Sequence, residues 1–104
     1  MKPIAVVTTV ANREDALRLA HILVERKLAA CAQISQIESI YRWQGEVQQS
    51  AELRILFKTT DERYELVEST IRELHPYELP AIHAFAFEHV YPAYGEWIAE
   101  NAGG

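Results

Sequence analysis

The chain has few cysteines, few basic residues and no long apolar run, and each shortage excludes a class of protein. It has one cysteine, Cys31, in 104 residues, so it can form no internal disulfide and a reducing compartment is expected. Basic residues number 10 against 15 acidic ones, and the net charge of −5 argues against a basic face for nucleic-acid phosphates. No apolar run approaches the roughly 18 residues of a membrane span. We therefore expect a cytoplasmic protein that binds neither nucleic acid nor membrane.

Length and composition predict a single domain over residues 1–104, because the apolar fraction of 49% is ordinary for a globular protein of this length. Residues 4–10 form a nearly unbroken apolar and β-branched run, which is typical of a strand buried on both faces. Asn12 is the predicted N-cap of a helix. The apolar stripe of this helix is predicted to be Leu17, Ala20, Val24 and Leu28.

The second half of the chain repeats this order of elements. A second helix is predicted from an apolar stripe and ends at His75, because the following proline disfavours a helical residue before it. A last strand is predicted over residues 80–89, followed by a short helix near Trp97. The order β-α-β-β-α-β plus a tail helix predicts an α+β, ferredoxin-like sandwich with helices on one face of the sheet.

The middle of the chain, residues 31–59, predicts a long hairpin. Gln44-Gly45 lies between two strand-like runs, and glycine takes a positive φ in a tight turn without strain. Ile34, Ile37 and Ile40 recur every three residues, which suggests a bulge near Ser35-Gln36. Each arm would span about 40 Å at ~3.3 Å per residue, so the hairpin would protrude from its own chain. A protruding, half-apolar ribbon predicts an oligomer.

Several blocks of the sequence resemble the CutA family of divalent-ion tolerance proteins. These blocks are Leu28-Ala29-Ala30-Cys31, residues 39–46 with Tyr41, Trp43 and Gly45, then Lys58-Thr59, residues 75–80 with the sequence His-Pro-Tyr-Glu-Leu-Pro, and the pair Tyr94 and Trp97. They stand in the family's order and span almost the whole chain. The resemblance implies a ferredoxin-like fold assembled as a homotrimer by sheet-edge pairing, a link to copper or other divalent metal ions, and no defined catalytic reaction.

Three residues are candidate metal ligands: His75, Glu78 and Cys31. Imidazole and carboxylate suit Cu(II) or Zn(II), and a thiolate suits Cu(I). Some family members carry a cysteine where this chain has Thr8 and a second histidine where it has Leu74. Without these ligands, we expect any copper or other divalent ion to be weakly held.

Each candidate also has a structural interpretation. Cys31 begins a strand and suits a small buried apolar position. His75 ends a helix, where its ring can bond to an unsatisfied backbone group. The sequence contains no CxxC, no His-x-His and no helical pair of histidines at metal-ligand spacing, so spacing alone predicts no strong metal site.

A second set of residues is a candidate ligand cleft between subunits, made of aromatic walls and a few charges. Its members are Tyr41, Glu52, Lys58, Tyr77 and Tyr94. Along the returning strand, Leu53, Ile55 and Phe57 are predicted to share one face, and Glu52 and Lys58 share the other. Glu52 and Lys58 therefore also fit an ion-pair ladder between strands or subunits. We interpret Trp43 as an anchor of the trimer interface, because tryptophan favours interface centres.

The leading hypothesis is therefore a non-enzymatic, trimeric metal-tolerance protein. The alternative is a PII-like regulatory trimer that binds a small metabolite or a protein partner in its intersubunit clefts. An enzyme acting on an acyl phosphate through Arg13 is less favoured, because the loop after the first strand lacks glycines to cradle a phosphate. RNA binding is excluded by the missing aromatics on the first strand and by the negative charge.

Overall fold

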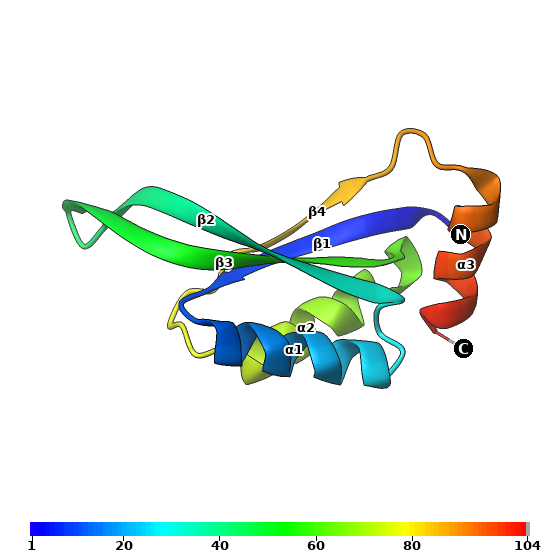
Figure 1. The fold of residues 1–104 in the computed structure, drawn as a ribbon, viewed down its shortest axis with the longest axis horizontal. Coiled ribbons are helices and arrows are strands. Elements are labelled where there is room, and N and C mark those ends of the chain that lie inside the picture. The colour runs from blue at the N-terminus through cyan, green and yellow to red at the C-terminus, as the bar shows by residue number, and fades with distance from the viewer. Residues whose placement is uncertain (104) are drawn as a thin grey trace.

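The computed structural model describes residues 1–103, which fold into one four-stranded antiparallel sheet with α1 and α2 on one face (Figure 1). The elements in chain order are β1 (Pro3–Val10), α1 (Arg13–Glu25), β2 (Cys31–Trp43), β3 (Glu46–Thr60), a one-turn 3-10 helix (Asp61–Arg63), α2 (Tyr64–Leu74), β4 (Ile82–Ala86) and α3 (Pro92–Asn101). The strand order is β2-β3-β1-β4. This is the ferredoxin-like arrangement that the sequence predicted.

The core lies between the sheet and the two helices α1 and α2. β1 is central, pairing antiparallel with β3 on one side and β4 on the other, which explains its nearly continuous burial. Ile55 and Phe57 of β3 are fully buried on the helix-covered face, as the alternation in the sequence predicted. Burying one such side chain contributes roughly 1.5–3 kcal/mol.

The start of α1 matches the prediction, and its buried face matches it only in part. The Asn12 side chain accepts a hydrogen bond from the backbone N–H of Asp15 at 2.8 Å, so the predicted N-cap is confirmed. The buried residues of the helix are Ala16, Leu19, Ala20 and Leu23. Of the predicted stripe, Ala20 and Leu28 are buried, whereas Leu17 is half-buried and Val24 is exposed. The period was counted through Leu28, which lies beyond the end of the helix. The helix ends at Glu25, and Lys27 has a left-handed φ of 57° that turns Leu28 into the core.

The hairpin of β2 and β3 is continuous and has no bulge. Its pairing runs one to one from Cys31 opposite Lys58 to Trp43 opposite Glu46, so the predicted bulge is wrong. The turn residues Gln44 and Gly45 have φ values of 52° and 82°, as a two-residue hairpin turn with this twist requires. Without a bulge, the isoleucines recurring every three residues of β2 alternate between the two sheet faces.

β4 is shorter than predicted, covering five residues instead of residues 80–89. Its pairing with β1 ends at Ala86 opposite Ile4, because β1 begins one residue earlier, at Pro3. The short tail helix is confirmed as α3, which lies at the end of the sheet opposite to the hairpin tip (Figure 1). Among residues 1–103, no helix has both the length and the apolar character to cross a membrane.

Candidate functional site: a pocket beside the hairpin

His75 is the residue that ties the end of α2 to the sheet. It is the C-cap of α2, and only 9% of its surface is exposed. The backbone N–H of Tyr77 donates to its Nδ1 at 3.1 Å, and its Nε2 lies 2.8 Å from the carbonyl oxygen of Thr9. Because Nδ1 is an acceptor, the ring is neutral with the proton on Nε2, which donates to Thr9. These contacts agree with the structural interpretation of His75, in which its ring bonds to backbone groups near the end of the helix.

These contacts set the electrostatics of His75. Burial, which disfavours the charged ring, is the main reason that the pKa of His75 lies below its ordinary value; the carbonyl of Thr9 opposes this only in part. Both ring nitrogens are already hydrogen-bonded, so His75 could bind a metal ion only by giving up one of these bonds.

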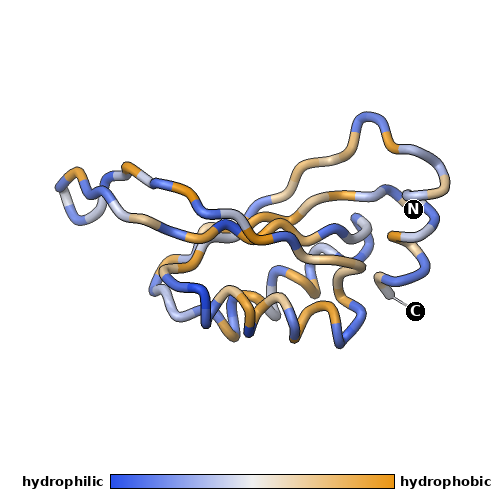
Figure 2. The backbone as a smooth tube through the Cα atoms, viewed as in Figure 1, coloured by the Kyte–Doolittle hydropathy of each residue, from blue (hydrophilic) through white to orange (hydrophobic). Residues whose placement is uncertain are grey.

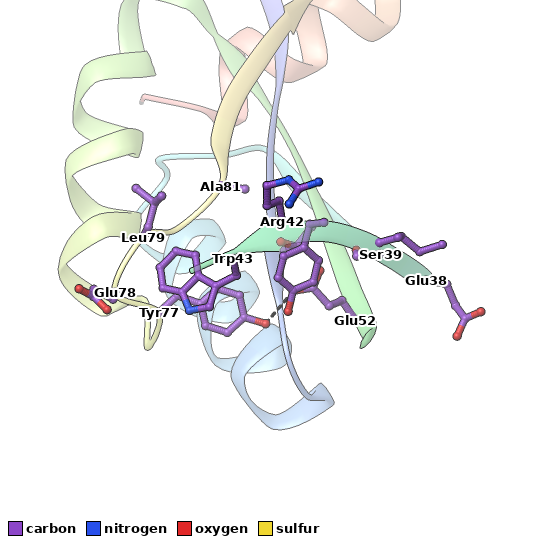
Figure 3. Close-up of a pocket in the computed structure, with 12 residues that line it drawn as sticks. Glu38, Ser39, Arg42, Trp43, Glu52, Tyr77, Glu78, Leu79 and Ala81 are labelled. Atoms are coloured by element: carbon purple, nitrogen blue, oxygen red, sulfur yellow. Dashed lines mark hydrogen bonds between the residues drawn. The ribbon is translucent and has the colours of Figure 1, made fainter. Parts of the chain in front are cut away.

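Tyr77 carries the connection from His75 to the hairpin. The two rings meet edge to face at 4.8 Å, and the Tyr77 hydroxyl donates to Oε2 of Glu52 at 2.7 Å (Figure 3). Burial raises the pKa of Tyr77 above its ordinary value, and the hydrogen bond to the Glu52 carboxylate raises it further. Tyr77 therefore stays a proton donor and fixes the Glu52 side chain on β3.

A pocket of about 790 Å³ opens where the hairpin passes the loop after α2 (Figure 3). Its lining combines aromatic rings, carboxylates and one guanidinium: Thr9, Glu38, Ser39, Ile40, Tyr41, Arg42, Trp43, Glu52, Tyr77, Glu78, Leu79 and Ala81. Tyr41 is held by a 3.0 Å hydrogen bond to Ser50 across the hairpin. The Arg42 guanidinium donates to the carbonyl of Gly45 at 3.5 Å, so it is directed toward the turn.

The other sequence-predicted residues lie at the opposite end of the sheet. The Lys58 ammonium donates to the Tyr94 hydroxyl at 3.0 Å and lies 5.1 Å from the centre of the Tyr94 ring. Cys31, directly opposite Lys58 on β2, has its sulfur 3.9 Å from the same hydroxyl. Lys58 is six residues from Glu52 along β3, or roughly 20 Å at ~3.3 Å per residue.

Within one chain, the members of each predicted set, the metal candidates and the cleft candidates, thus lie at different ends of the sheet. Tyr41, Glu52 and Tyr77 come together around the pocket, while Lys58 and Tyr94 form a separate contact. Of the metal candidates, Glu78 lies at the pocket and Cys31 at the other end. Within residues 1–103, no three side chains of His, Cys, Asp or Glu lie close enough together to hold a metal ion.

Sequence reasoning missed two parts of this site. The hydrogen bond from Tyr77 to Glu52 joins residues that are 25 positions apart, so no local pattern in the sequence predicts it. The anchor of His75 is a backbone carbonyl, that of Thr9, so it leaves no signal in the side-chain sequence. The alternation along β3 did place Glu52 on the open sheet face, which was the one available signal.

The comparison with known proteins decides the family. Residues 4–101 match the family described as CutA1 divalent ion tolerance protein. The chain belongs to the CutA1 family. It is 40% identical over 98 residues to the divalent-cation tolerance protein CutA of Thermotoga maritima, covering 94% of this chain and 97% of that protein. The protein of the same name from Thermus thermophilus is 41% identical over 99 residues, covering 94% and 96%.

Solved structures of CutA1 relatives share the whole fold. The divalent cation tolerance protein of Thermus thermophilus superposes with a TM-score of 0.93 at 40% identity, covering 97% of this chain and 99% of that one. The periplasmic divalent cation tolerance protein CutA of Archaeoglobus fulgidus gives a TM-score of 0.93 at 31% identity, covering 96% and 98%. The CutA1 family is named for a tolerance phenotype and not for a reaction.

Proposed function

We propose that this protein is a homotrimer of the divalent-cation tolerance type that binds copper or another divalent metal ion weakly and contributes to the cell's response to metal ions. The observation that carries this proposal is identity of about 40% along almost the entire chain to two proteins named for divalent-cation tolerance. The proposed role is binding and not catalysis, in keeping with the name of the family.

The hairpin supports the trimer. β1 pairs with β3 only as far as Leu53, so the outer part of the hairpin has no neighbouring strand within the chain. Ile40 and Val47 on this part are 70% and 65% exposed. Exposed apolar side chains beside unpaired strand edges favour pairing with another chain, and Trp43 at the hairpin end is the proposed interface anchor.

The arrangement of ligands supports weak and not tight metal binding. Tight copper sites combine several imidazole or thiolate ligands, and residues 1–103 of one chain contain no such cluster. Of the three candidates, Glu78 is exposed, whereas His75 and Cys31 are engaged in the contacts described above. We propose that Glu78 contributes to a weak site that ligands from other chains complete.

Two measurements test this proposal. Sedimentation of the protein at micromolar concentration should give the mass of three chains, and a stable particle of one chain would refute the assembly. Calorimetric titration of metal-free protein with Cu(II) should show saturable uptake with a Kd below about 1 mM. Glu78→Gln should weaken this uptake, and Glu62→Gln, which changes an exposed glutamate elsewhere, should leave it unchanged. Absence of uptake would refute the metal half of the proposal alone.

The proposed compartment is the cytoplasm. The single cysteine supports it, because a reducing compartment makes no use of disulfides. The Archaeoglobus fulgidus relative is named as periplasmic, so the compartment is a property to measure in each member. Cell fractionation with antibodies against the native protein should recover it with cytoplasmic markers, and recovery with periplasmic markers would refute this part.

A further inference from the structure

We propose that copies of this chain meet through the open face of the sheet, where carboxylates on the outer hairpin of one copy contact cations on the inner sheet of its neighbour. The outer hairpin is residues 37–52, beyond the end of the pairing with β1 at Leu53, and the inner sheet is the four-stranded part. The open face is the one opposite to α1 and α2 (Figure 1). This inference rests on the proposed assembly and specifies its contact.

The charged side chains on the open face are sorted by sign along β3. Alternate residues of β3 point to this face. They are Glu46, Gln48, Ser50 and Glu52 in the outer hairpin, followed by Arg54, Leu56 and Lys58 in the inner sheet. The sign changes where the sheet narrows from four strands to two, since β1 pairs no further than Leu53. The open face therefore has an acidic half and a basic half.

The other three strands do not blur this separation. The residues of β1 and β2 that share this face are uncharged: Ala5, Val7, Thr9 and every second residue of β2 from Cys31 to Trp43. β4 adds His83 and Phe85, opposite Val7 and Ala5 of β1. An imidazole is neutral or positive, so His83 leaves the inner half free of carboxylates.

These charges are not neutralised within one chain. Among residues 1–103, no oppositely charged side chain lies within 4.0 Å of any of the four: Glu46, Glu52, Arg54 and Lys58. The Glu52 carboxylate accepts the Tyr77 hydroxyl at 2.7 Å, and the Lys58 ammonium donates to the Tyr94 hydroxyl at 3.0 Å. Neutral partners thus hold both side chains in place and leave their charges to attract a charged partner.

A second copy of the chain is the partner that matches both halves. Within one chain the halves cannot meet, because β3 is one extended strand and its Glu46 and Lys58 lie about 40 Å apart at ~3.3 Å per residue. A partner of one charge sign would match one half and be repelled by the other. Each half also carries an exposed ring, that of Trp43 on the outer hairpin and that of Phe85 on the inner sheet.

The same pattern suits a ring of copies. Each copy contributes its acidic half to one neighbour and its basic half to the other, which is a head-to-tail contact. Such a contact closes into a ring when the rotation between neighbours allows it. Complementary charges also fix which halves meet, because two acidic or two basic halves repel each other.

The test reverses one charge on each half. Arg54 and Glu46 are both exposed, so substitution should leave the circular dichroism spectrum unchanged. Arg54→Glu and Glu46→Arg, each alone, should weaken the association measured by sedimentation by at least about tenfold. The double variant restores opposite charges between neighbouring copies, so it should associate within about threefold of the wild type.

Glu38 supplies the matched control. It is exposed on the outer hairpin, but it pairs with Ala51 on the other face of the strands. Arg54→Glu combined with Glu38→Arg has the same net charge as the first double variant, yet it should stay as weakly associated as Arg54→Glu alone.

Salt gives a readout that a purely structural defect would not move. Raising the ionic strength from about 0.05 M to about 0.5 M should weaken association of the wild type and strengthen that of Arg54→Glu, because screening removes attraction in one and repulsion in the other.

The contrary results separate this contact from the assembly itself. Wild-type affinity of Arg54→Glu, or equal recovery by the two double variants, would overturn the contact and leave the assembly standing. Wild-type protein that sediments as one chain would refute the assembly, and this contact with it.

Discussion

The two halves of the hairpin are built from the same two strands, yet they lie in different surroundings. Near the helices, Phe57 is fully buried, while ten residues earlier on the same strand face Val47 is 65% exposed. Along the outer hairpin, short hydrophobic segments alternate with hydrophilic ones (Figure 2). The comparison shows that one uninterrupted ladder can serve both a monomer's core and a surface that is free for other contacts.

The largest expected effect comes from the covered half. Phe57→Ala should lower the free energy of unfolding by about 3–5 kcal/mol, because it removes a buried ring and leaves a cavity. Gln49→Ala, on the same strand face in the outer hairpin, should change it by less than about 0.5 kcal/mol. Urea denaturation followed by circular dichroism measures both. Similar losses for the two variants would mean that the outer hairpin is as enclosed as the core.

Removing the His75 side chain should have the next largest effect on stability. His75→Ala leaves the Thr9 carbonyl and the Tyr77 N–H without their partner, so unfolding should become easier by about 2 kcal/mol near neutral pH.

The sign of the pH effect follows from the lowered pKa of His75. Below about pH 6.5 the unfolded chain binds a proton at this residue more readily than the folded chain, so stability should fall with decreasing pH. Urea titrations over this range should show a smaller pH dependence for His75→Gln than for the wild type. An unchanged slope would show that another group is responsible.

Replacing Thr8, on the core side of β1, should have a smaller effect of opposite sign on the free energy of unfolding. Its hydroxyl is buried and has no hydrogen-bond partner among residues 1–103. Thr8→Val keeps the shape and removes the unsatisfied group, so the free energy of unfolding should increase by about 1 kcal/mol. Thermal denaturation measures this, and a loss of stability would indicate an ordered water at Thr8.

The smallest effect on the folded chain, and the most informative for assembly, is expected at the outer hairpin. Ile40→Lys places a charge on a side chain that is 70% exposed, so the circular dichroism spectrum should stay unchanged. In the proposed trimer this charge would disrupt apolar contact between copies. Sedimentation should show at least about a tenfold weaker association. Gln49→Lys, on the neighbouring strand, controls for the added charge, and equal dissociation by both would point to charge repulsion alone.

Much of this architecture could be predicted from local patterns, because turns and strand faces are local properties. Gln44-Gly45 located the hairpin turn, and the alternation of Leu53, Ile55 and Phe57 identified the core face of β3. The α1 stripe was only partly right, because helix ends are poorly encoded and the period was counted beyond the end of the helix.

The site was less predictable, because it depends on which distant segments meet. Sequence reasoning placed Tyr41, Glu52 and Tyr77 together, and the fold brings them to one pocket. It also grouped Lys58 and Tyr94 with them, whereas within one chain β3 separates the two groups by about six residues of extended strand. Only assembly of several chains could reunite them, and no pattern in the sequence specifies that geometry.

The unbroken one-to-one pairing of β2 with β3 limits how this protein can change in length. Deleting one residue from a single arm would shift every pair beyond it and exchange the two faces of that strand. Tyr41 would then leave the pocket side together with the rest of the outer arm. Relatives with longer or shorter hairpins should therefore differ by matched changes, with as many residues gained or lost before the turn as after it.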